Sequence, residues 1–237
     1  MTTYILGSIG SGKTSLTQLL AKDMAVTPYY EDVEGNKLIK DMLQKFYSAG
    51  AESRKQTAAM LQLAFLSQRY KDLKKALVEH NALLDGNLES DFVMAKSLHD
   101  NKEIDDVDFN VYTIISQEMQ ANVNGMPWGG YPDLAIYLKI SPENEIKNIF
   151  KRGREMETQD PELIKYYHRV NKAYEEWSQG YTRGIMVTID RDKYDFVSNI
   201  HDRDVVLNKI EQKLVDLGKL TPSEFDTIKK RRKEEGK

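Results

Sequence analysis

The residues with the clearest chemical purpose lie near the start of the chain. Residues 7–15 read Gly-Ser-Ile-Gly-Ser-Gly-Lys-Thr-Ser, which fits the phosphate-binding pattern G-x-x-x-x-G-K-S/T. Glycines let backbone amides approach phosphate oxygens, and a helix that follows the loop points its positive end at the same anion. The residues expected to hold the nucleotide are Gly7, Ser8, Gly10, Ser11, Gly12, Lys13, Thr14 and Ser15.

Two side chains of this loop have specific expected roles. Lys13 is expected to reach the β- and γ-phosphates, and the Thr14 hydroxyl is expected to bind Mg²⁺. Residues 2–6 have the composition of a strand and residues 15–24 have the apolar spacing of a helix, which is the context that the motif requires. The chain is therefore predicted to bind a nucleoside triphosphate, with ATP as the phosphate donor.

A carboxylate cluster, Tyr-Glu-Asp-Val-Glu at residues 30–34, follows the second apolar run. In an open α/β sheet, ligands bind beyond the carboxyl ends of the strands, where this cluster and the phosphate loop would both lie. Glu31 is the residue expected to accept the proton of a substrate hydroxyl. A solvated acidic loop is the alternative interpretation.

Asp85 ends the third apolar run and is expected to complete the Mg²⁺ site together with Thr14. The same aspartate could instead cap the helix that is predicted to start near residue 88.

Arg152 and Arg154 flank a glycine at the end of another helical pattern. Two arginines placed in this way can close over the transferred phosphoryl group as a lid, offsetting its developing charge and excluding water. An ordinary basic helix end, favoured by the helix dipole, is the alternative.

Short apolar runs alternate with long helical patterns, which indicates a parallel sheet flanked by helices. The predicted fold is α/β, with a five-stranded parallel sheet flanked by helices and an arginine lid. The expected strands are 2–6, 26–30, 82–85, 134–140 and 185–189. The expected helices lie near 15–24, 37–46, 55–79, 88–98, 107–123, 143–152, 161–178 and 204–217, and residues 124–132 are expected to form a loop.

Length and composition limit the classes of function. The 237 residues suggest one main domain at 1–218 and a charged helical extension at 219–237, whose basic run at 229–233 we interpret as a solvated helix end. A net charge of −3 argues against a nucleic-acid partner, and no apolar stretch is long enough to span a membrane. The absence of cysteine excludes disulfides and favours a cytoplasmic protein.

These clusters, in this order, resemble the deoxynucleoside kinase family, in particular its bacterial deoxyadenosine/deoxyguanosine kinase branch. The resemblance runs over about residues 3–217, and its most specific part is Tyr-Leu-Lys-Ile-Ser-Pro-Glu at 137–143 followed by Arg-Gly-Arg-Glu-Met-Glu at 152–157. It implies that Glu31 is the general base for the sugar 5′-hydroxyl and that Tyr47 and Glu157 hold the 3′-hydroxyl. Residues implied to read the base are Gln62, Arg69 and Asp91; without the resemblance, Gln62 and Arg69 would be expected on the surface.

The resemblance implies a P-loop kinase fold, with a deoxynucleoside kinase-like domain at 1–218. It further implies ATP-dependent phosphorylation of the 5′-hydroxyl of a deoxynucleoside in nucleotide salvage, with a purine or deoxycytidine favoured over thymidine. It also implies that the partners are small molecules and a second copy of the chain, in a homodimer.

Two positions depart from the family pattern. Gly86 stands where the family normally has an arginine at the end of the third strand, and Asn148 stands where many relatives carry an arginine one turn before the lid. The sequence is therefore that of a divergent member. Two alternatives remain open: a deoxynucleoside monophosphate kinase, and a non-catalytic regulatory nucleotide-binding subunit.

Overall fold

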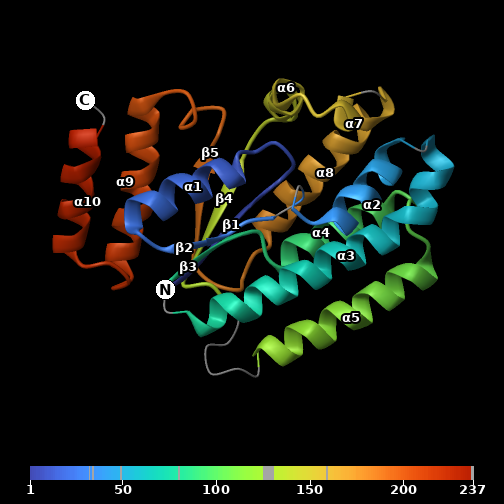
Figure 1. Ribbon diagram of the computed structural model, residues 1–237, viewed down its shortest axis with the longest axis horizontal. Coiled ribbons are helices and arrows are strands. Elements are labelled where there is room, and N and C mark those ends of the chain that lie inside the picture. The colour runs from blue at the N-terminus through green and yellow to red at the C-terminus, as the bar shows by residue number, and fades with distance from the viewer. Residues whose placement is uncertain are drawn as a thin grey trace.

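The computed structural model describes residues 1–31, 33, 35–48, 50–79, 81–124, 131–158 and 160–235. Its central sheet has five parallel strands in the order β2-β3-β1-β4-β5 (Figure 1). The strands are β1 (Thr2–Gly7), β2 (Thr27–Tyr29), β3 (Ala82–Asp85), β4 (Leu134–Lys139) and β5 (Met186–Asp190). All five predicted strands are confirmed, and no strand end differs from its predicted position by more than one residue.

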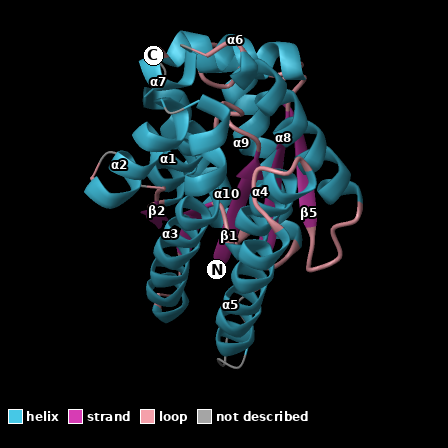
Figure 2. Cartoon of the chain, turned by 90° about the vertical axis from the view of Figure 1, so that its right-hand side faces the viewer, coloured by secondary structure: helices cyan, strands magenta, loops and turns pink. Residues whose placement is uncertain are grey.

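Helices cover both faces of the sheet, as Figures 1 and 2 show: α1, α9 and α10 lie on one side, and α3, α4, α5 and α8 lie on the other. Their bounds are α1 (Lys13–Met24), α2 (Lys37–Ser48), α3 (Gly50–Val78), α4 (Leu88–Asp100), α5 (Asp106–Asn124), α6 (Pro142–Arg152), α7 (Glu155–Thr158), α8 (Glu162–Gln179), α9 (Ile200–Asp216) and α10 (Pro222–Glu235). The eight predicted helices are present, and α7 is a short helix that the periodicity did not reveal. Most of the predicted loop, residues 125–130, lies outside the described residues.

The two faces of β1 build two separate parts of the core. Ile5 packs with residues of α1 and α9, whereas Tyr4 and Leu6 pack with residues of α3, α4 and α5. Alternate side chains of a strand point to opposite faces, so a strand between two helical layers must be apolar on both. Burial of each such side chain contributes about 1.5–3 kcal/mol, which fixes β1 at the centre of the sheet.

The strand order reverses at β1, because β3 lies on one side of it and β4 on the other. Such a reversal opens a crevice beyond the carboxyl ends of the strands, and the phosphate loop crosses it between β1 and α1. Gly12 is the residue that caps α1, with a left-handed φ of 96° that a residue with a side chain would adopt only at a cost.

Two other helices hold the back of the phosphate loop. The Ser8 hydroxyl donates a hydrogen bond to Oε2 of Glu145 in α6 at 2.5 Å, and the amide of Asn171 in α8 donates to the same oxygen. The amide of Asn148, also in α6, donates to the Gly10 carbonyl at 3.0 Å. Burial raises the pKa of Glu145 to about 7, although the hydrogen bonds from Asn171 and Ser8 oppose this shift.

The helix α10 is fastened to the body of the protein by a buried ion-pair cluster. Nε of Arg232 lies 3.1 Å from Oδ2 of Asp23 in α1, and its Nη2 contacts the fully buried carboxylate of Glu211 in α9. The interpretation of residues 229–233 as a solvated helix end is therefore wrong for Arg232. Phe225 and Ile228 of the same helix are buried, and the Arg232 side chain is largely buried with them.

We predict that Arg232→Met destabilises the protein by about 3 kcal/mol, because removal of one partner leaves buried carboxylates without their cation. Urea unfolding followed by circular dichroism would measure this loss. Lys233→Met, an exposed position of the same helix, is the matched control and should change the free energy of unfolding by less than about 0.5 kcal/mol. Equal effects of the two substitutions would contradict a buried role for Arg232.

A second prediction concerns the pH dependence of stability. The pKa of Glu145 is higher in the folded protein than in the unfolded chain, so the folded state binds the extra proton between pH 4.5 and about 7, and stability falls as the pH rises through that window. Glu145→Gln mimics the protonated form, so its stability relative to the wild type should rise by about 2 kcal/mol between pH 5 and 7.5.

Unfolding of the ligand-free protein at the two pH values would test this. Glu143→Gln, which changes an exposed carboxylate of the same helix, is the control and should show no such trend. A difference between Glu145→Gln and the wild type that is the same at both pH values would refute the prediction.

Candidate active site

One cavity of about 800 Å³ lies beyond the carboxyl ends of the strands, and nearly all the predicted site residues line it. The phosphate loop, the loop after β2, the helices α2, α3 and α4, and the segment from α6 to α7 all contribute to its wall. The predicted residues found in the wall are Gly7, Gly10, Gly12, Lys13, Thr14, Ser15, Glu31, Tyr47, Gln62, Arg69, Asp91, Arg152, Arg154 and Glu157.

Ser8 and Ser11 were expected to contact the nucleotide, but their side chains point away from the cavity. The Ser8 hydroxyl bonds to Glu145, and the Ser11 hydroxyl donates to the Ser8 carbonyl at 2.9 Å. Both are buried, and the Ser11 amide also donates to the Ser8 carbonyl, at 3.4 Å, so these two residues stabilise the loop from behind.

Lys13 lies at the donor end of the cavity, with its ammonium group 3.0 Å from the Gly7 carbonyl and 2.9 Å from the Ser8 carbonyl. The loop thus holds a positive charge directly at the start of α1, where the helix dipole adds to it.

Thr14 and Asp85, the two residues expected to bind Mg²⁺, are in contact. The Thr14 hydroxyl donates to Oδ2 of Asp85 at 2.6 Å, while Oδ1 of Asp85 is buried with no hydrogen-bond partner among the described residues. Burial raises the pKa of Asp85 and the charge of Lys13 opposes this, so a cation beside the free oxygen would favour the carboxylate. Mg²⁺ typically takes one or two protein oxygens with the remainder from phosphate and water, which this pair can supply.

The alternative role of Asp85 as a helix cap is wrong. The cap of α4 is Asn87, whose side chain accepts from the Ser90 amide while the Ser90 hydroxyl accepts from the Asn87 amide.

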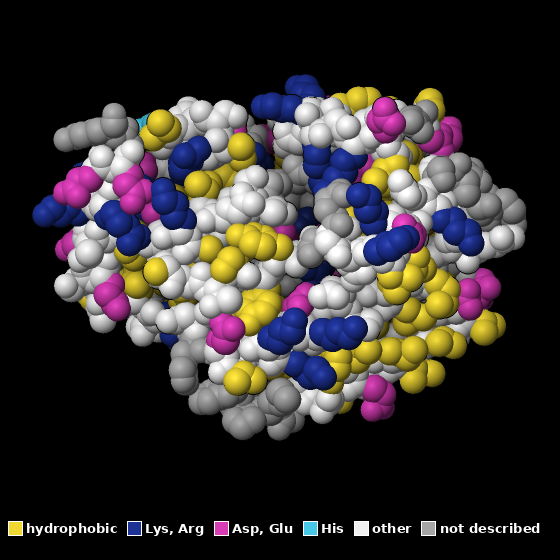
Figure 3. Space-filling view, viewed as in Figure 1, with side chains coloured by type: hydrophobic (Ala, Val, Ile, Leu, Met, Phe, Trp, Pro, Cys, Tyr) yellow, Lys and Arg dark blue, Asp and Glu magenta, His cyan; other side chains and the backbone are white. Residues whose placement is uncertain are grey.

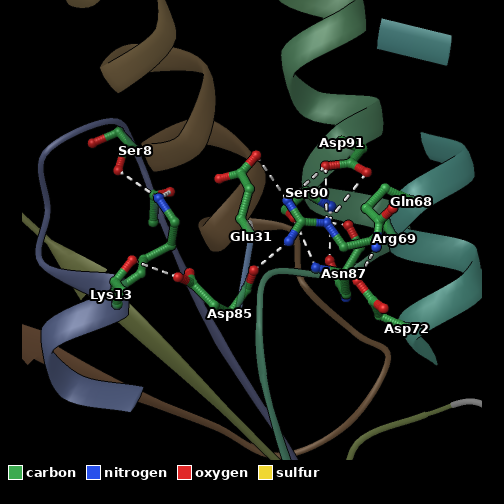
Figure 4. Close-up of polar contacts among 12 residues, drawn as sticks. Ser8, Lys13, Glu31, Gln68, Arg69, Asp72, Asp85, Asn87, Ser90 and Asp91 are labelled. Atoms are coloured by element: carbon green, nitrogen blue, oxygen red, sulfur yellow. Dashed lines mark hydrogen bonds and ion pairs between the residues drawn. The ribbon is translucent and has the colours of Figure 1, made fainter. Parts of the chain in front are cut away.

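Two carboxylates and one backbone carbonyl converge on a single guanidinium near this position (Figure 4). The Nη2 atom of Arg69 in α3 lies 3.1 Å from Oδ1 of Asp91 in α4 and 3.5 Å from Oε1 of Glu31. Its Nη1 donates to the backbone carbonyl of Asp85. Burial acts to lower the pKa of Arg69, but Asp91 and Glu31 raise it overall, so the guanidinium stays charged.

These contacts decide two questions that the sequence left open. Glu31 lines the cavity and lies within ion-pair distance of Arg69, so it does not belong to a solvated loop, although its neighbours Asp32 and Glu34 lie outside the described residues. Gln62 is only 4 % exposed and the side chain of Arg69 only 11 %, so the expectation of surface positions is wrong for both. They lie seven residues apart on α3, on the face that turns toward the cavity.

The candidate lid residues converge on a third acidic group. Nη2 of Arg152 lies 2.6 Å from Oε2 of Glu157, and Nη1 of Arg154 lies 3.5 Å from Oε1 of the same residue. Burial and the nearby charge of Glu157 raise the pKa of Tyr47, which also lines this end of the cavity. The turn at Gly153 ends α6 and brings both arginines to one side of Glu157.

The sequence reasoning missed Arg191 in the cavity wall. Its Nε donates to the Ser11 carbonyl at 3.0 Å, and its guanidinium lies 4.0 Å from the ring centre of Phe196. Arg191 directly follows β5, and the same rule that selected Glu31 and Asp85, namely position at the carboxyl end of a strand, could have identified it.

The arrangement provides a phosphate loop with a cation and a metal-binding pair at one end, and a carboxylate with buried polar side chains at the other. A donor phosphate and an acceptor hydroxyl could therefore meet between Lys13 and Glu31, under the arginines of the lid.

Comparison with known proteins agrees with this geometry. The chain is 35% identical over 222 residues to deoxyguanosine kinase of Lactobacillus johnsonii, covering 92% of this chain and 95% of the relative. It is 33% identical over 216 residues to deoxyadenosine kinase of Lactobacillus acidophilus, covering 90% and 96%. The structure of deoxyadenosine kinase from M. mycoides with the products dCMP and a flexible dCDP bound superposes with a TM-score of 0.71 at 25% identity, covering 90% of this chain and 100% of that one.

The family profile described as "Deoxynucleoside kinase" matches residues 4–216, which is most of the chain. Together with relatives more than 30% identical over nearly the full length, this match shows that the chain belongs to the deoxynucleoside kinase family.

Proposed function

We propose that this deoxynucleoside kinase transfers the γ-phosphoryl group of ATP to the 5′-hydroxyl of a purine deoxynucleoside or deoxycytidine, in nucleotide salvage. The observation that carries the proposal is that one cavity is lined both by the phosphate loop and by a carboxylate with buried polar side chains at hydrogen-bonding positions. The names of the relatives, deoxyguanosine and deoxyadenosine kinase, support a purine, and the dCMP product bound to the M. mycoides enzyme supports deoxycytidine as a second acceptor.

In the proposed reaction, Glu31 accepts the proton of the 5′-hydroxyl. The freed oxygen attacks the γ-phosphorus, and the bond from that phosphorus to the oxygen bridging the β- and γ-phosphates breaks, so that ADP leaves. A positioned general base contributes about 10²–10⁴-fold to such a rate.

Positive groups stabilise the charge that develops on the transferred phosphoryl. Lys13 approaches it from the loop, and Arg152 and Arg154 approach it from the lid. Thr14 and Asp85 would hold Mg²⁺, which neutralises phosphate charge and orients the donor.

At the acceptor end we propose that Tyr47 and Glu157 hold the sugar 3′-hydroxyl, and that Gln62 and Asp91 face the base, with Arg69 beside them. The Gln62 amide offers one donor group and one acceptor, a pair that suits the edge of a purine or of cytosine. The buried position of Gln62 supports this role, because an unpaired amide in that place would be costly.

The two alternatives receive less support. A monophosphate acceptor would need a free cation near the 5′ position, whereas the N–H groups of Arg69 there already point at Asp85, Asp91 and Glu31. A non-catalytic subunit would not need Glu31, Thr14 and Asp85 in the positions they occupy.

We predict that the purified protein with ATP and Mg²⁺ converts deoxyguanosine or deoxyadenosine, and to a lesser degree deoxycytidine, into the 5′-monophosphate, and that chelation of Mg²⁺ stops the reaction. Glu31→Gln should lower kcat by about 10²–10⁴-fold, because the proton acceptor is lost. Chromatography of the products of each of the four deoxynucleosides and their monophosphates would measure this.

Glu79→Gln, an exposed carboxylate outside the cavity, is the control and should keep wild-type activity. Turnover of a monophosphate with the nucleoside inert would select the monophosphate kinase, and unchanged activity of Glu31→Gln would remove Glu31 from the mechanism.

We further propose that the protein is a homodimer that associates through α3 and α5. Hydrophobic side chains run along these two neighbouring helices in Figure 3, and Met60, Val107, Val111 and Ile114 are exposed there. Exposed apolar patches of this kind commonly mark protein–protein contacts.

We also propose a cytoplasmic location, a catalytic domain at residues 1–218 and a supporting helical extension at 219–237. No helix in the described part of the chain is long and apolar enough to cross a membrane.

We predict that Val111→Glu converts the dimer into a monomer, because a charge placed at the centre of an apolar contact must be desolvated. Light scattering coupled to size-exclusion chromatography would give the mass. Ile200→Glu, at an exposed apolar position outside the two helices, should leave the dimer intact. A wild-type monomer, or a Val111→Glu variant that remains dimeric, would contradict this interface.

A further inference from the structure

At the end of β3, the guanidinium of Arg69 fills the space that a side chain at position 86 would need. A Cβ atom built on Gly86 would lie 2.6 Å from Nη1 of Arg69, 2.7 Å from its Cζ and 2.9 Å from its Nη2. These separations are far below ordinary contact distances, so any side chain at position 86 would displace the guanidinium. Gly86 also has a φ of +100°, which residues with side chains rarely adopt.

The guanidinium that occupies this space is fixed on several sides. Nε of Arg69 lies 3.3 Å from both carboxylate oxygens of Asp91, Nη2 lies 3.1 Å from one of them, and Nη1 donates to the Asp85 carbonyl. The remaining contact of Nη2 is Glu31, at 3.5 Å. The planar fork of an arginine can serve these separate oxygens at once, which the single ammonium group of a lysine cannot do.

This arrangement makes Arg69 the group that connects the rigid part of the site to Glu31. Asp85 and Asp91 are buried at the ends of β3 and the start of α4, whereas Glu31 lies on a loop and its side chain is 31 % exposed. A loop carboxylate needs a fixed partner to stay oriented, and Arg69 is such a partner because Asp91 and the Asp85 carbonyl hold it in place.

Resting on the proposed function, we propose that Arg69 is a positioning residue for Glu31, and that the missing side chain at Gly86 is what admits its guanidinium to that position. Arg69 thereby acts on the reacting hydroxyl through Glu31 and serves as more than a contact to the base.

The charged groups around Glu31 give the positioning role of Arg69 a measurable consequence, which is the pH dependence of the transfer rate. The titratable and charged groups that face it are Lys13 from the phosphate loop, Tyr47 from α2, Arg69 from α3, Asp85 from β3, Asp91 from α4, Tyr174 from α8, and Arg152, Arg154 and Glu157 from the lid. Removal of Arg69 takes away the ion-pair partner of Glu31 and leaves Lys13 to compensate Asp85 and Asp91. Because loss of a nearby cation disfavours a negatively charged base, a base that works as an anion would then be active only at higher pH.

The first test is the single-turnover rate of phosphoryl transfer at saturating ATP and deoxynucleoside, measured as a function of pH. For Arg69→Met we expect a rate about 100-fold lower at pH 7, with the acid limb of the pH profile moved up by about one unit. Arg69→Lys keeps the charge but loses the fork, so it should keep the position of the acid limb and lose part of the rate.

Arg54→Met is the matched control, because Arg54 is an equally buried, ion-paired arginine of the same helix outside the cavity. It should lower stability without moving the acid limb. If Arg69→Met raises only KM for the deoxynucleoside and leaves the saturated rate and the pH profile unchanged, Arg69 only contacts the base and the proposal is overturned.

The second test is a double-mutant cycle between positions 86 and 69. Gly86→Ala should slow transfer about 10-fold or more in the wild type, but by less than about 3-fold when Arg69 is already alanine, because the displaced guanidinium is then absent. Backbone strain at position 86 would act equally in both backgrounds, so equal losses would overturn the role assigned to Gly86.

The outcomes also separate this inference from the proposed function. A wild-type protein that phosphorylates no deoxynucleoside would refute the function itself. An active wild type whose Glu31→Gln variant is inactive, but whose Arg69 variants keep the wild-type acid limb, would refute only the positioning role of Arg69.

Discussion

Buried negative charge is the constraint around which this site is arranged. A parallel sheet brings the carboxyl ends of β2 and β3 to one edge, so Glu31 and Asp85 necessarily lie close together, and the start of α4 adds Asp91. Removing carboxylates from water is costly unless cations or hydrogen bonds replace the solvent. Arg69 and Lys13 are the cations that offset the charge of this cluster, and the apolar packing of α3 and α4 against the sheet brings Arg69 among these oxygens.

Behind the phosphate loop, a buried carboxylate is stabilised without an ion pair. Glu145 is fully buried behind the phosphate loop, where hydrogen bonds from Ser8 and Asn171 take the place of an ion pair. Because Glu145 belongs to α6, and α6 leads directly into Arg152 and Arg154, the lid starts from a helix that is attached to the loop it serves. The phosphate loop and the segment with Arg152 and Arg154 are therefore joined through one helix.

The sequence was most informative where local chemistry decides structure. The strands could be predicted because each is buried on both faces and reads as a short apolar run, and the ends of those strands located Glu31 and Asp85. The phosphate loop was equally clear, since Lys13 and Thr14 have fixed places in its motif. The burial of Gln62, however, depends on which face α3 turns to the sheet, and only the resemblance to a family suggested it.

Contacts between segments that are far apart in the sequence could not be predicted from local sequence patterns. Nothing near Gly86 in the chain shows that a guanidinium from α3 occupies the space beside it, and nothing near Asn171 shows a carboxylate from α6. Arg232 is a similar case, because a basic run with glutamates after it looks solvated until the partner helices are placed. Each of these contacts is set by tertiary packing, which a pattern along the chain does not encode.

The position of α10 has a consequence for the order in which the protein can fold during synthesis. During synthesis α1 is made well before α10, whose Arg232 pairs with Asp23 of α1. Until α10 has been made, the face of α1 that it covers is exposed, and Asp23 lacks the arginine, Arg232, that pairs with it in the folded protein. The contact between α1 and α10 is therefore one of long sequence separation, and because loop-closure entropy delays such contacts, this part of the structure is expected to form late in folding.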